Sequence, residues 1–261
     1  MINDSTQGRW HVLLAQFDVI CRRFNKEHVI AMVAESTAWL TSPDGVSYPP
    51  APWRLHGTAY VSLWQVRASA LPADWLPQDL RPVTMLGRVL VGTAFAVYEP
   101  SGDLAYNEVL AAVQVHGSGR PSLTVPFIWV DHPASIAGAR AMWSIPKQEA
   151  AFRIRQPRDA EDPRFRASAE TPDEQPIADL LFRSRTSMPG RWPVRTAIVQ
   201  TSLMGSGGGD LRITPAQAWA RVSFGTATWD FGRQSPFSFL RGRNPFVSVR
   251  LTEMSLHFGS S

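Results

Sequence analysis

Apolar residues near the start of the chain recur at a spacing of three or four positions. Between residues 10 and 35 they are Trp10, Leu13, Leu14, Phe17, Ile20, Phe24, Val29 and Val33. This spacing is typical of an amphipathic helix, and polar residues around Asn25 indicate a break into two helices. We therefore predict a helical N-terminal extension over residues 1–45. Ser, Asp, Gly and Pro are frequent in residues 42–53, which predicts an extended loop there.

Strand-like patterns dominate the rest of the chain. Runs rich in β-branched and aromatic residues, which favour strands, cover residues 59–66, 88–98, 106–116, 123–130, 151–155 and 246–258. The sequence Pro-Ser-Gly-Asp at residues 100–103 is typical of a turn. It predicts that the runs 88–98 and 106–116 pair as a hairpin.

Few segments have a helical pattern. We predict a short turn or helix at residues 71–77 and a helix at residues 133–143. Thr214 and Pro215 have the residue types of a helix N-cap and of a first helical position, which predicts a short helix there. Charged residues and prolines predict an exposed loop over residues 157–175.

The order of these elements predicts the fold class. Many short strands with few helices indicate an α+β fold, an antiparallel β-barrel or sandwich with peripheral helices. No internal repeat is visible in the sequence. The glycine-rich residues 205–209 predict a flexible connection, since no Gly-Lys-Ser/Thr follows that would make a phosphate-binding loop.

Composition agrees with one folded domain. The 261 residues are 44% hydrophobic and 18% charged, which is enough apolar material for a core and argues against disorder. One cysteine, Cys21, excludes an intrachain disulfide. The N-terminus lacks the pattern of a signal peptide, and no apolar run reaches the roughly 18 residues of a membrane span. We expect a soluble cytoplasmic protein without a membrane partner.

The basic residues are arginine with two exceptions. The net charge is +4, and the arginines are scattered, so we expect no nucleic-acid partner. Of 26 basic residues only Lys26 and Lys147 are lysine. Unlike arginine, lysine can lose its proton and become a nucleophile. Lys26 lies in a polar stretch, whereas Lys147 follows Met142, Trp143 and Ile145.

The apolar surroundings of Lys147 predict a reactive amine. Such surroundings disfavour the ammonium form and lower the pKa of a lysine from about 10.4. A neutral amine attacks a ketone, and the resulting iminium supports loss of CO2, loss of water or cleavage of a carbon–carbon bond. The alternative is a structural lysine that extends from a strand end with its amine in solvent.

Two motifs resemble those of a known family. Asp131, Arg140, Met142, Trp143, Pro146 and Lys147 fall at the spacing that the acetoacetate decarboxylase family has around its Schiff-base lysine. Tyr106-Asn107-Glu108 is similar to the family's Tyr-x-Glu, which supplies an active-site carboxylate. Residues 53–61 resemble the family's first core strand, and residues 221–258 resemble its C-terminal strands. Acetoacetate decarboxylase is itself a familiar example of an enzyme with an activated lysine nucleophile.

The resemblance implies a function and a set of site residues. It implies a single α+β, barrel-like domain over residues 1–261 that forms homo-oligomers and needs no cofactor. It implies a lyase in which Lys147 forms a Schiff base with an oxo acid or related carbonyl compound and Glu108 moves the proton. Arg140, Tyr106, Trp143 and Gln148 are the expected substrate-binding residues. Decarboxylation and aldol-type or dehydration chemistry both remain open.

Several positions depart from the family pattern. Gln148 stands where the family has a second lysine, and Ala141 stands where it has a glutamate. Where the family has an arginine at the start of its first core strand, this chain has Thr58 or a neighbouring residue. Where the family has a further acidic residue, this chain has the uncharged Gly92 and Thr93. These departures imply that acetoacetate itself is not the substrate.

The remaining polar candidates have structural alternatives. Arg140 is expected either to bind a substrate carboxylate or to pair with Asp131, and Glu108 is either a pocket carboxylate or an exposed strand residue. His116 and His132 are not at metal-ligand spacing, so we expect no metal. Ser135 and Ser144 lack a recognisable histidine base, which predicts no serine nucleophile. Most of the ten tryptophans are expected in the core.

Two other classes of function fit the same sequence. Because the chain lacks the family's second lysine and its further acidic residue, it also fits a non-catalytic small-molecule binding protein on this fold. It also fits an enzyme that works without a Schiff base and holds its substrate in an aromatic pocket.

Overall fold

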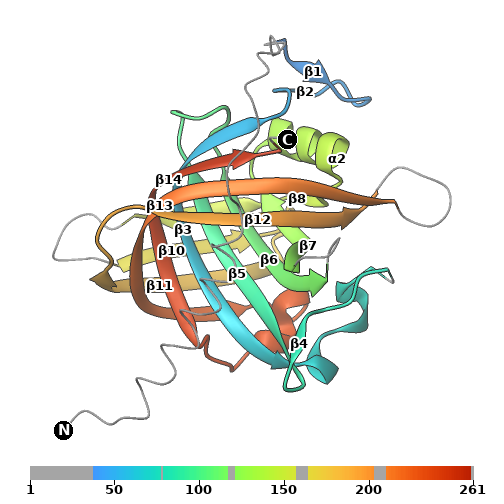
Figure 1. Ribbon diagram of the computed structural model, residues 1–261. Helices are drawn as coiled ribbons and strands as arrows, with labels where there is room; N and C mark the ends of the chain where they lie inside the picture. Colours follow the sequence, from blue (N-terminus) through green and yellow to red (C-terminus); the bar gives the residue numbers. More distant parts are fainter. Residues whose placement is uncertain (1–37, 78, 117–120, 157–163, 203–209, 260–261) are drawn as a thin grey trace, which may run out of the picture.

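The computed structural model describes residues 38–77, 79–116, 121–156, 164–202 and 210–259. Strands make up most of this part of the chain (Figure 1). They are β1 (Leu40–Thr41), β2 (Ser47–Tyr48), β3 (Trp53–Arg67), β4 (Thr84–Met85), β5 (Arg88–Tyr98), β6 (Asn107–His116), β7 (Pro121–Val130), β8 (Lys147–Glu149), β9 (Ala151–Arg155), β10 (Arg164–Glu170), β11 (Pro176–Ser187), β12 (Trp192–Thr201), β13 (Leu211–Phe231) and β14 (Val247–Phe258). The helices are α2 (Pro133–Trp143) and the short 3-10 helices η1 (Ala68–Ala70), η2 (Ala73–Trp75) and η3 (Pro236–Leu240).

Most of the strands belong to one sheet with the order β12-β7-β6-β5-β3-β14-β13-β11-β10-β9. Strand β12 also pairs with β13, so the strands from β12 to β13 in that order form a closed ring of hydrogen-bonded neighbours. The β-rich fold with peripheral helices is therefore confirmed. The sheet is not wholly antiparallel, because β7 pairs in parallel with both β12 and β8.

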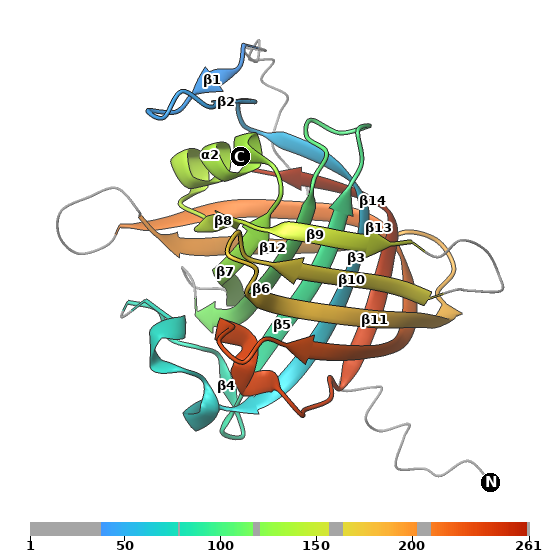
Figure 2. The same cartoon turned by 180° about the vertical axis from the view of Figure 1, so that it is seen from behind.

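Strand β13 takes part in both halves of the sheet. Its first half pairs with β12, and its second half pairs with β11, which leads to β10 and β9. The register shifts between Trp219 and Arg221, a β-bulge that bends the strand between the two partners. Figure 2 shows β9, β10 and β11 as a layer on the side of β3 and β5 away from β12.

The central strands are buried on both faces. In β3, Trp53, Leu55 and Ala59 point into the ring, whereas Tyr60, Trp64 and Val66 point toward the layer of β9 to β11. Successive side chains of a strand alternate between faces, so one strand serves two apolar cores. This arrangement explains why residues 59–66 of β3 are apolar except for Ser62 and Gln65.

Two segments differ from the sequence prediction. Residues 164–170 form strand β10, although residues 157–175 were expected to be a loop. Phe165, Ala167 and Ala169 are buried at every second position, and this alternation is the strand signal that the charged residues between them obscured. Thr214 and Pro215 lie inside β13 and begin no helix, because Thr214 pairs with Ile198 of β12.

The N-terminal prediction is tested only at its end. The helical pattern over residues 10–35 lies outside the described residues, as does the glycine-rich stretch 205–209. Residues 38–45 contain β1 and a turn, so this end of the predicted extension is not helical. Strands β1 and β2 form a hairpin, and β2 lies against α2. Within the described residues, none of the helices has both the length and the apolar character needed to cross a membrane.

Close packing holds α2 against the ring. A Cβ atom on Gly138 would lie 2.5 Å from Cζ2 of Trp53 and 2.9 Å from Cδ2 of Tyr48. We therefore expect Gly138→Ala to destabilise the protein by about 1–3 kcal/mol through overpacking, seen as a lower midpoint of thermal unfolding. Ala141→Ser, on the exposed side of the same helix, is the control and should change the midpoint little. An unchanged midpoint in Gly138→Ala would show that the helix can shift at no cost.

Candidate functional site

The chain reverses between α2 and β8 and places Lys147 inside the protein. Helix α2 ends at Trp143, and the capping residue Ser144 has a left-handed conformation with φ 55°. The N–H of Ser144 donates to the carbonyl of Arg140, and the N–H of Ile145 donates to that of Ala139, so the last turn of the helix is capped. Strand β8 then begins at Lys147, which aligns with Ile128 of β7. Lys147 is 4% exposed.

The Lys147 amine has three partners. Nζ donates to Oε2 of Glu108 at 2.8 Å, to Oγ of Ser135 at 2.9 Å and to the hydroxyl of Tyr106 at 3.0 Å. An ammonium group has three donors, so each has an acceptor. The partners come from β6, α2 and the residue before β6, elements that are adjacent only in the folded chain. The alternative of a lysine with its amine in solvent is therefore wrong.

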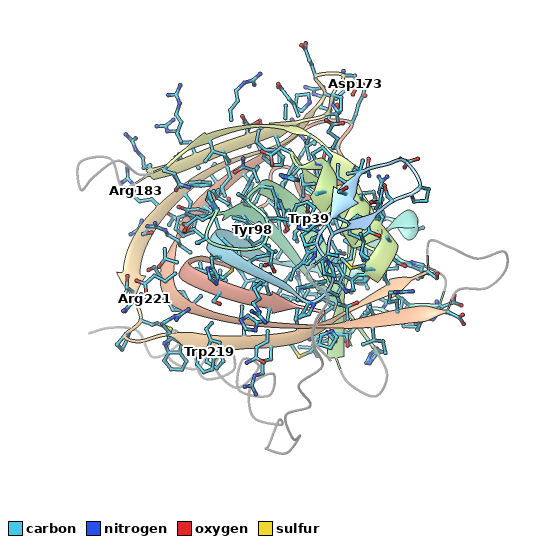
Figure 3. The ribbon with its side chains drawn as sticks, turned by 90° about the horizontal axis from the view of Figure 1, so that it is seen from above. Trp39, Tyr98, Asp173, Arg183, Trp219 and Arg221 are labelled. Carbon is cyan, nitrogen blue, oxygen red and sulfur yellow. The ribbon has the colours of Figure 1, made fainter. Side chains whose placement is uncertain are left out.

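Glu108 is held within the ring. It lies in β6 between Ala96 of β5 and Val130 of β7, and it is 4% exposed. Its second oxygen, Oε1, accepts a long hydrogen bond of 3.4 Å from the hydroxyl of Tyr98. Figure 3 shows Tyr98 in the middle of the molecule, enclosed by the strands. Glu108 is thus a buried carboxylate, and the alternative of an exposed strand glutamate is wrong.

Burial dominates the electrostatics of this cluster. Lys147 and Glu108 are the only charged side chains that are buried in the described part of the chain. Loss of hydration lowers the pKa of Lys147 from its ordinary value of 10.5, while the Glu108 carboxylate opposes this shift. Burial and the same carboxylate raise the pKa of Tyr98 and of Tyr106 well above 10.0. The two tyrosines are therefore neutral hydroxyls near neutral pH, and Lys147 gives up its proton more readily than an exposed lysine.

Asp131 ties together two segments of the cluster. Its carboxylate accepts from the backbone N–H of Asn107 at 2.7 Å and from the side-chain amide of Asn107 at 2.6 Å. Asn107 lies between Tyr106 and Glu108 in sequence, and Asp131 precedes α2, which carries Ser135. Within the described residues Asp131 forms no ion pair with Arg140. The upstream aspartate of the motif thus helps to fix the carboxylate relative to the helix.

Three of the predicted substrate-binding residues do not contact the amine. Ser135 lies on the buried side of α2. Arg140 follows five positions later, about 140° around the helix, and is therefore exposed. Gln148 is also exposed, because successive residues of a strand point to opposite faces and Lys147 points inward. Trp143 is buried, but its ring packs edge-on against Trp53 and Phe258, with centroids 4.8 Å and 4.7 Å away. Only Tyr106 and Glu108 of the predicted set lie beside Lys147.

The structure adds two residues that sequence reasoning missed. Ser135 was considered only as a nucleophile, and it is instead an acceptor for the lysine amine. A signal was present, since Ser135 falls among the small residues Ala134, Gly138 and Ala139 on the buried side of the helix. Tyr98 ends a strand-like run, and nothing in its local pattern distinguishes it from a core tyrosine. In the described residues no group of three or more His, Cys, Asp or Glu side chains is placed to hold a metal.

The comparison with protein families identifies the chain. Residues 37–230 match the family model described as acetoacetate decarboxylase (ADC). The chain therefore belongs to the acetoacetate decarboxylase family, and the resemblance noted in the sequence is confirmed. No curated protein sequence matches the chain.

Solved structures share the fold at low sequence identity. The enduracididine biosynthesis enzyme MppR complexed with pyruvate is 17% identical with a TM-score of 0.61, and the match covers 84% of this chain and 93% of that one. Acetoacetate decarboxylase from Legionella pneumophila subsp. pneumophila str. Philadelphia 1 is 17% identical with a TM-score of 0.62, covering 90% and 95%. An acetoacetate decarboxylase-like enzyme from Sphingomonas wittichii RW1 is 15% identical with a TM-score of 0.57, covering 87% and 98%. Similarity at these identities establishes the common fold.

Proposed function

We propose that this protein is a lyase whose Lys147 forms a Schiff base with an oxo acid or related carbonyl compound other than acetoacetate. The observation that carries the proposal is the buried Lys147 amine, 2.8 Å from the Glu108 carboxylate, in a chain of the acetoacetate decarboxylase family. Two similar structures support it, since one is an acetoacetate decarboxylase and the other is an enzyme complexed with pyruvate. Pyruvate is an oxo acid, which is the substrate class expected from the sequence.

The arrangement supplies each proton that imine formation needs. The ammonium of Lys147 passes a proton to the carboxylate of Glu108, and the neutral amine attacks the carbonyl carbon. Water then leaves with one proton from the nitrogen and the proton held by Glu108. The product is an iminium, and Glu108 is again a carboxylate.

The iminium activates the neighbouring carbon. It withdraws electrons, so that a carboxylate on that carbon leaves as CO2, or Glu108 removes a proton from it and an enamine forms. The hydroxyls of Tyr106 and Ser135, which contact Nζ in the resting protein, hold the nitrogen in place. Their neutral, uncharged state follows from burial and from the raised pKa of Tyr106.

Reductive trapping tests the proposal. The protein is incubated with pyruvate, acetopyruvate and a panel of larger oxo acids and ketones, reduced with borohydride, and measured by intact mass. We expect a stable adduct with at least one compound, mapped by peptide mass to Lys147. Absence of an adduct with every member of the panel would refute the Schiff-base function.

A second candidate is a small-molecule binding protein without catalysis. It is favoured by the complete set of acceptors around the amine, because a fully satisfied ammonium resembles a structural ion pair. This candidate requires that Lys147 keep an ordinary pKa and that Lys147→Arg preserve ligand binding. Strong labelling of Lys147 near neutral pH would exclude it. An enzyme without a Schiff base would instead keep full activity in Lys147→Ala.

A further inference from the structure

The inner face of the ring beside Lys147 is apolar. Lys147 aligns with Ile128 of β7, and the same row of the sheet continues through Leu110 of β6, Ala94 of β5 and Val61 of β3. The neighbouring row contains Glu108 and continues through Ala96 and Ala59 to Leu251 of β14. Residues in one row of a sheet point to the same face, so these side chains line the inner face that also carries the amine and the carboxylate.

Part of this inner face is open. Val61, Ala94, Leu110 and Leu251 are half-buried, whereas Tyr60, Phe95 and Val109, which point to the other face of the same strands, are at most 1% exposed. Core side chains on the inner face of a filled ring would be fully buried like those on the other face. The ring thus presents accessible apolar surface within the Lys147 row and the neighbouring Glu108 row.

The opposite wall of the ring is uncharged at the middle of its strands within the described residues. It is formed by β12 and β13, whose inward side chains include Val194, Ala216 and Ala218, with Thr196 adding a neutral hydroxyl. Both walls of the ring therefore present small apolar and neutral side chains to its interior. Such a lining favours an apolar group over an ionised one.

The arginines nearest this surface are directed away from it or bound elsewhere. Arg140 lies on the exposed side of α2. Arg212 shares the inward face of β13 with Ala216 and Ala218, but its guanidinium is bound to the carbonyl oxygen of Met142, the residue before the last of α2. Arg195 of β12 and Arg250 of β14 alternate with the inward residues of their strands, so their side chains leave the sheet on its other face. The part of the chain that the structure describes therefore offers no free cation to this surface.

Among the described residues, a second anion would have no cationic partner on this surface. Glu108 and Lys147 neutralise each other, and the iminium that Lys147 forms keeps the same positive charge. A substrate carboxylate would therefore leave an uncompensated negative charge beside Glu108 in buried surroundings, which is strongly unfavourable.

We propose that the substrate carbonyl compound carries no carboxylate, and that it is a neutral aldehyde or ketone whose chain lies on the apolar inner face of the ring. This inference rests on the proposed Schiff-base function and narrows it from oxo acids to neutral carbonyl compounds. Without a carboxylate there is no CO2 to lose. Aldol-type or dehydration chemistry through the enamine then remains, and decarboxylation does not.

A set of three matched ketones tests the substrate class. 5-Oxohexanoate and 5-oxohexanamide have nearly the same shape and differ in charge, and 2-heptanone has an apolar chain of similar length. Each is incubated at equal concentration near neutral pH with the full-length protein and cyanoborohydride, and the initial rate of adduct formation is followed by intact mass. We expect the amide and 2-heptanone to react at least about tenfold faster than 5-oxohexanoate, because only the carboxylate of 5-oxohexanoate is an unpaired charge that must be buried.

The possible outcomes separate this inference from the function on which it rests. Equal or faster reaction of 5-oxohexanoate would overturn the inference and leave the Schiff base intact. No adduct with any of the three, nor with the oxo acids, would remove the Schiff-base function and the inference with it. As a second measurement, Leu110→Arg places a cation in the Lys147 row and should shift the preference toward 5-oxohexanoate. Leu181→Arg, on the exposed side of β11, is the control and should leave the preference unchanged.

Discussion

Lys147→Ala is expected to abolish the reducible adduct and to lower turnover of any carbonyl substrate by at least about a thousandfold, because no other group in the cluster forms a covalent bond to carbon. The chain has two lysines, so an adduct on a side-chain amine is confined to Lys147 or Lys26. Intact mass after borohydride reduction, followed by peptide mapping, is the measurement. The substrate is the carbonyl compound that gives the strongest adduct with the unmodified protein.

The control for this prediction is Lys26→Arg, which should keep both the adduct and the turnover. An adduct that persists in Lys147→Ala and disappears in Lys26→Arg would contradict the assignment. Removing Lys147 also leaves the buried Glu108 without its partner, which costs about 3–5 kcal/mol when the carboxylate stays ionised. The double variant Lys147→Ala with Glu108→Gln removes this charge, so it separates loss of chemistry from loss of folding.

Glu108→Gln is expected to have opposite effects on the reactivity of the amine and on turnover. The carboxylate raises the pKa of Lys147 against the larger lowering caused by burial. Replacing the carboxylate by a neutral amide removes the raising effect, so the pKa of Lys147 falls further below 10.5. More of the amine is then neutral near pH 7. Turnover should nevertheless fall by about 10²–10⁴, because the proton acceptor is lost.

The pH dependence of acylation measures the first effect. Acetic anhydride reacts with neutral amines, so the labelling rate of Lys147 rises with pH through the pKa of the amine. We expect the midpoint of this profile to lie below 10.5 in the unmodified protein and lower still in Glu108→Gln. Glu149→Gln, an exposed position in the same strand, is the control and should not move the midpoint. A midpoint that rises in Glu108→Gln would mean that burial does not control this amine.

The same shift has a consequence for stability. A lysine whose pKa is lowered in the native state binds fewer protons there than in the unfolded chain. The free energy of unfolding therefore rises with pH between the lowered native pKa and the ordinary value of 10.5. Removing the amine in the double variant should flatten this part of the stability profile.

Local patterns in the sequence predicted most of the strands and the helix that frame the site. The strand-like run at residues 88–98 is β5, and the predicted helix at residues 133–143 is α2. The first is rich in β-branched and aromatic residues, which favour strands, and the second is rich in small residues. β10 was missed because its buried alternation is short and lies among charged residues, and the helix expected at Thr214 was wrong because strand pairing outweighed the local capping signal.

The sequence by itself determined which groups are candidates for the chemistry. A lysine in an apolar segment and a glutamate in a strand-like run are visible without a structure, and the spacing of their motifs indicated the acetoacetate decarboxylase family. Tyr106 was named for the same reason. These assignments rest on residue type and local sequence context, which can be read from the sequence without a structure.

Only the tertiary structure decided which groups meet. Ser135 and Tyr98 join the site, and Arg140 and Gln148 face away from it, because the faces of α2 and β8 are set by packing against a ring that closes between β12 and β13. Pairings between distant segments also decide that, among the described residues, the rows that carry Lys147 and Glu108 are otherwise apolar. A one-residue change of register would turn Lys147 and Glu108 to the other face, so their 2.8 Å contact depends on long-range pairing that local sequence does not encode.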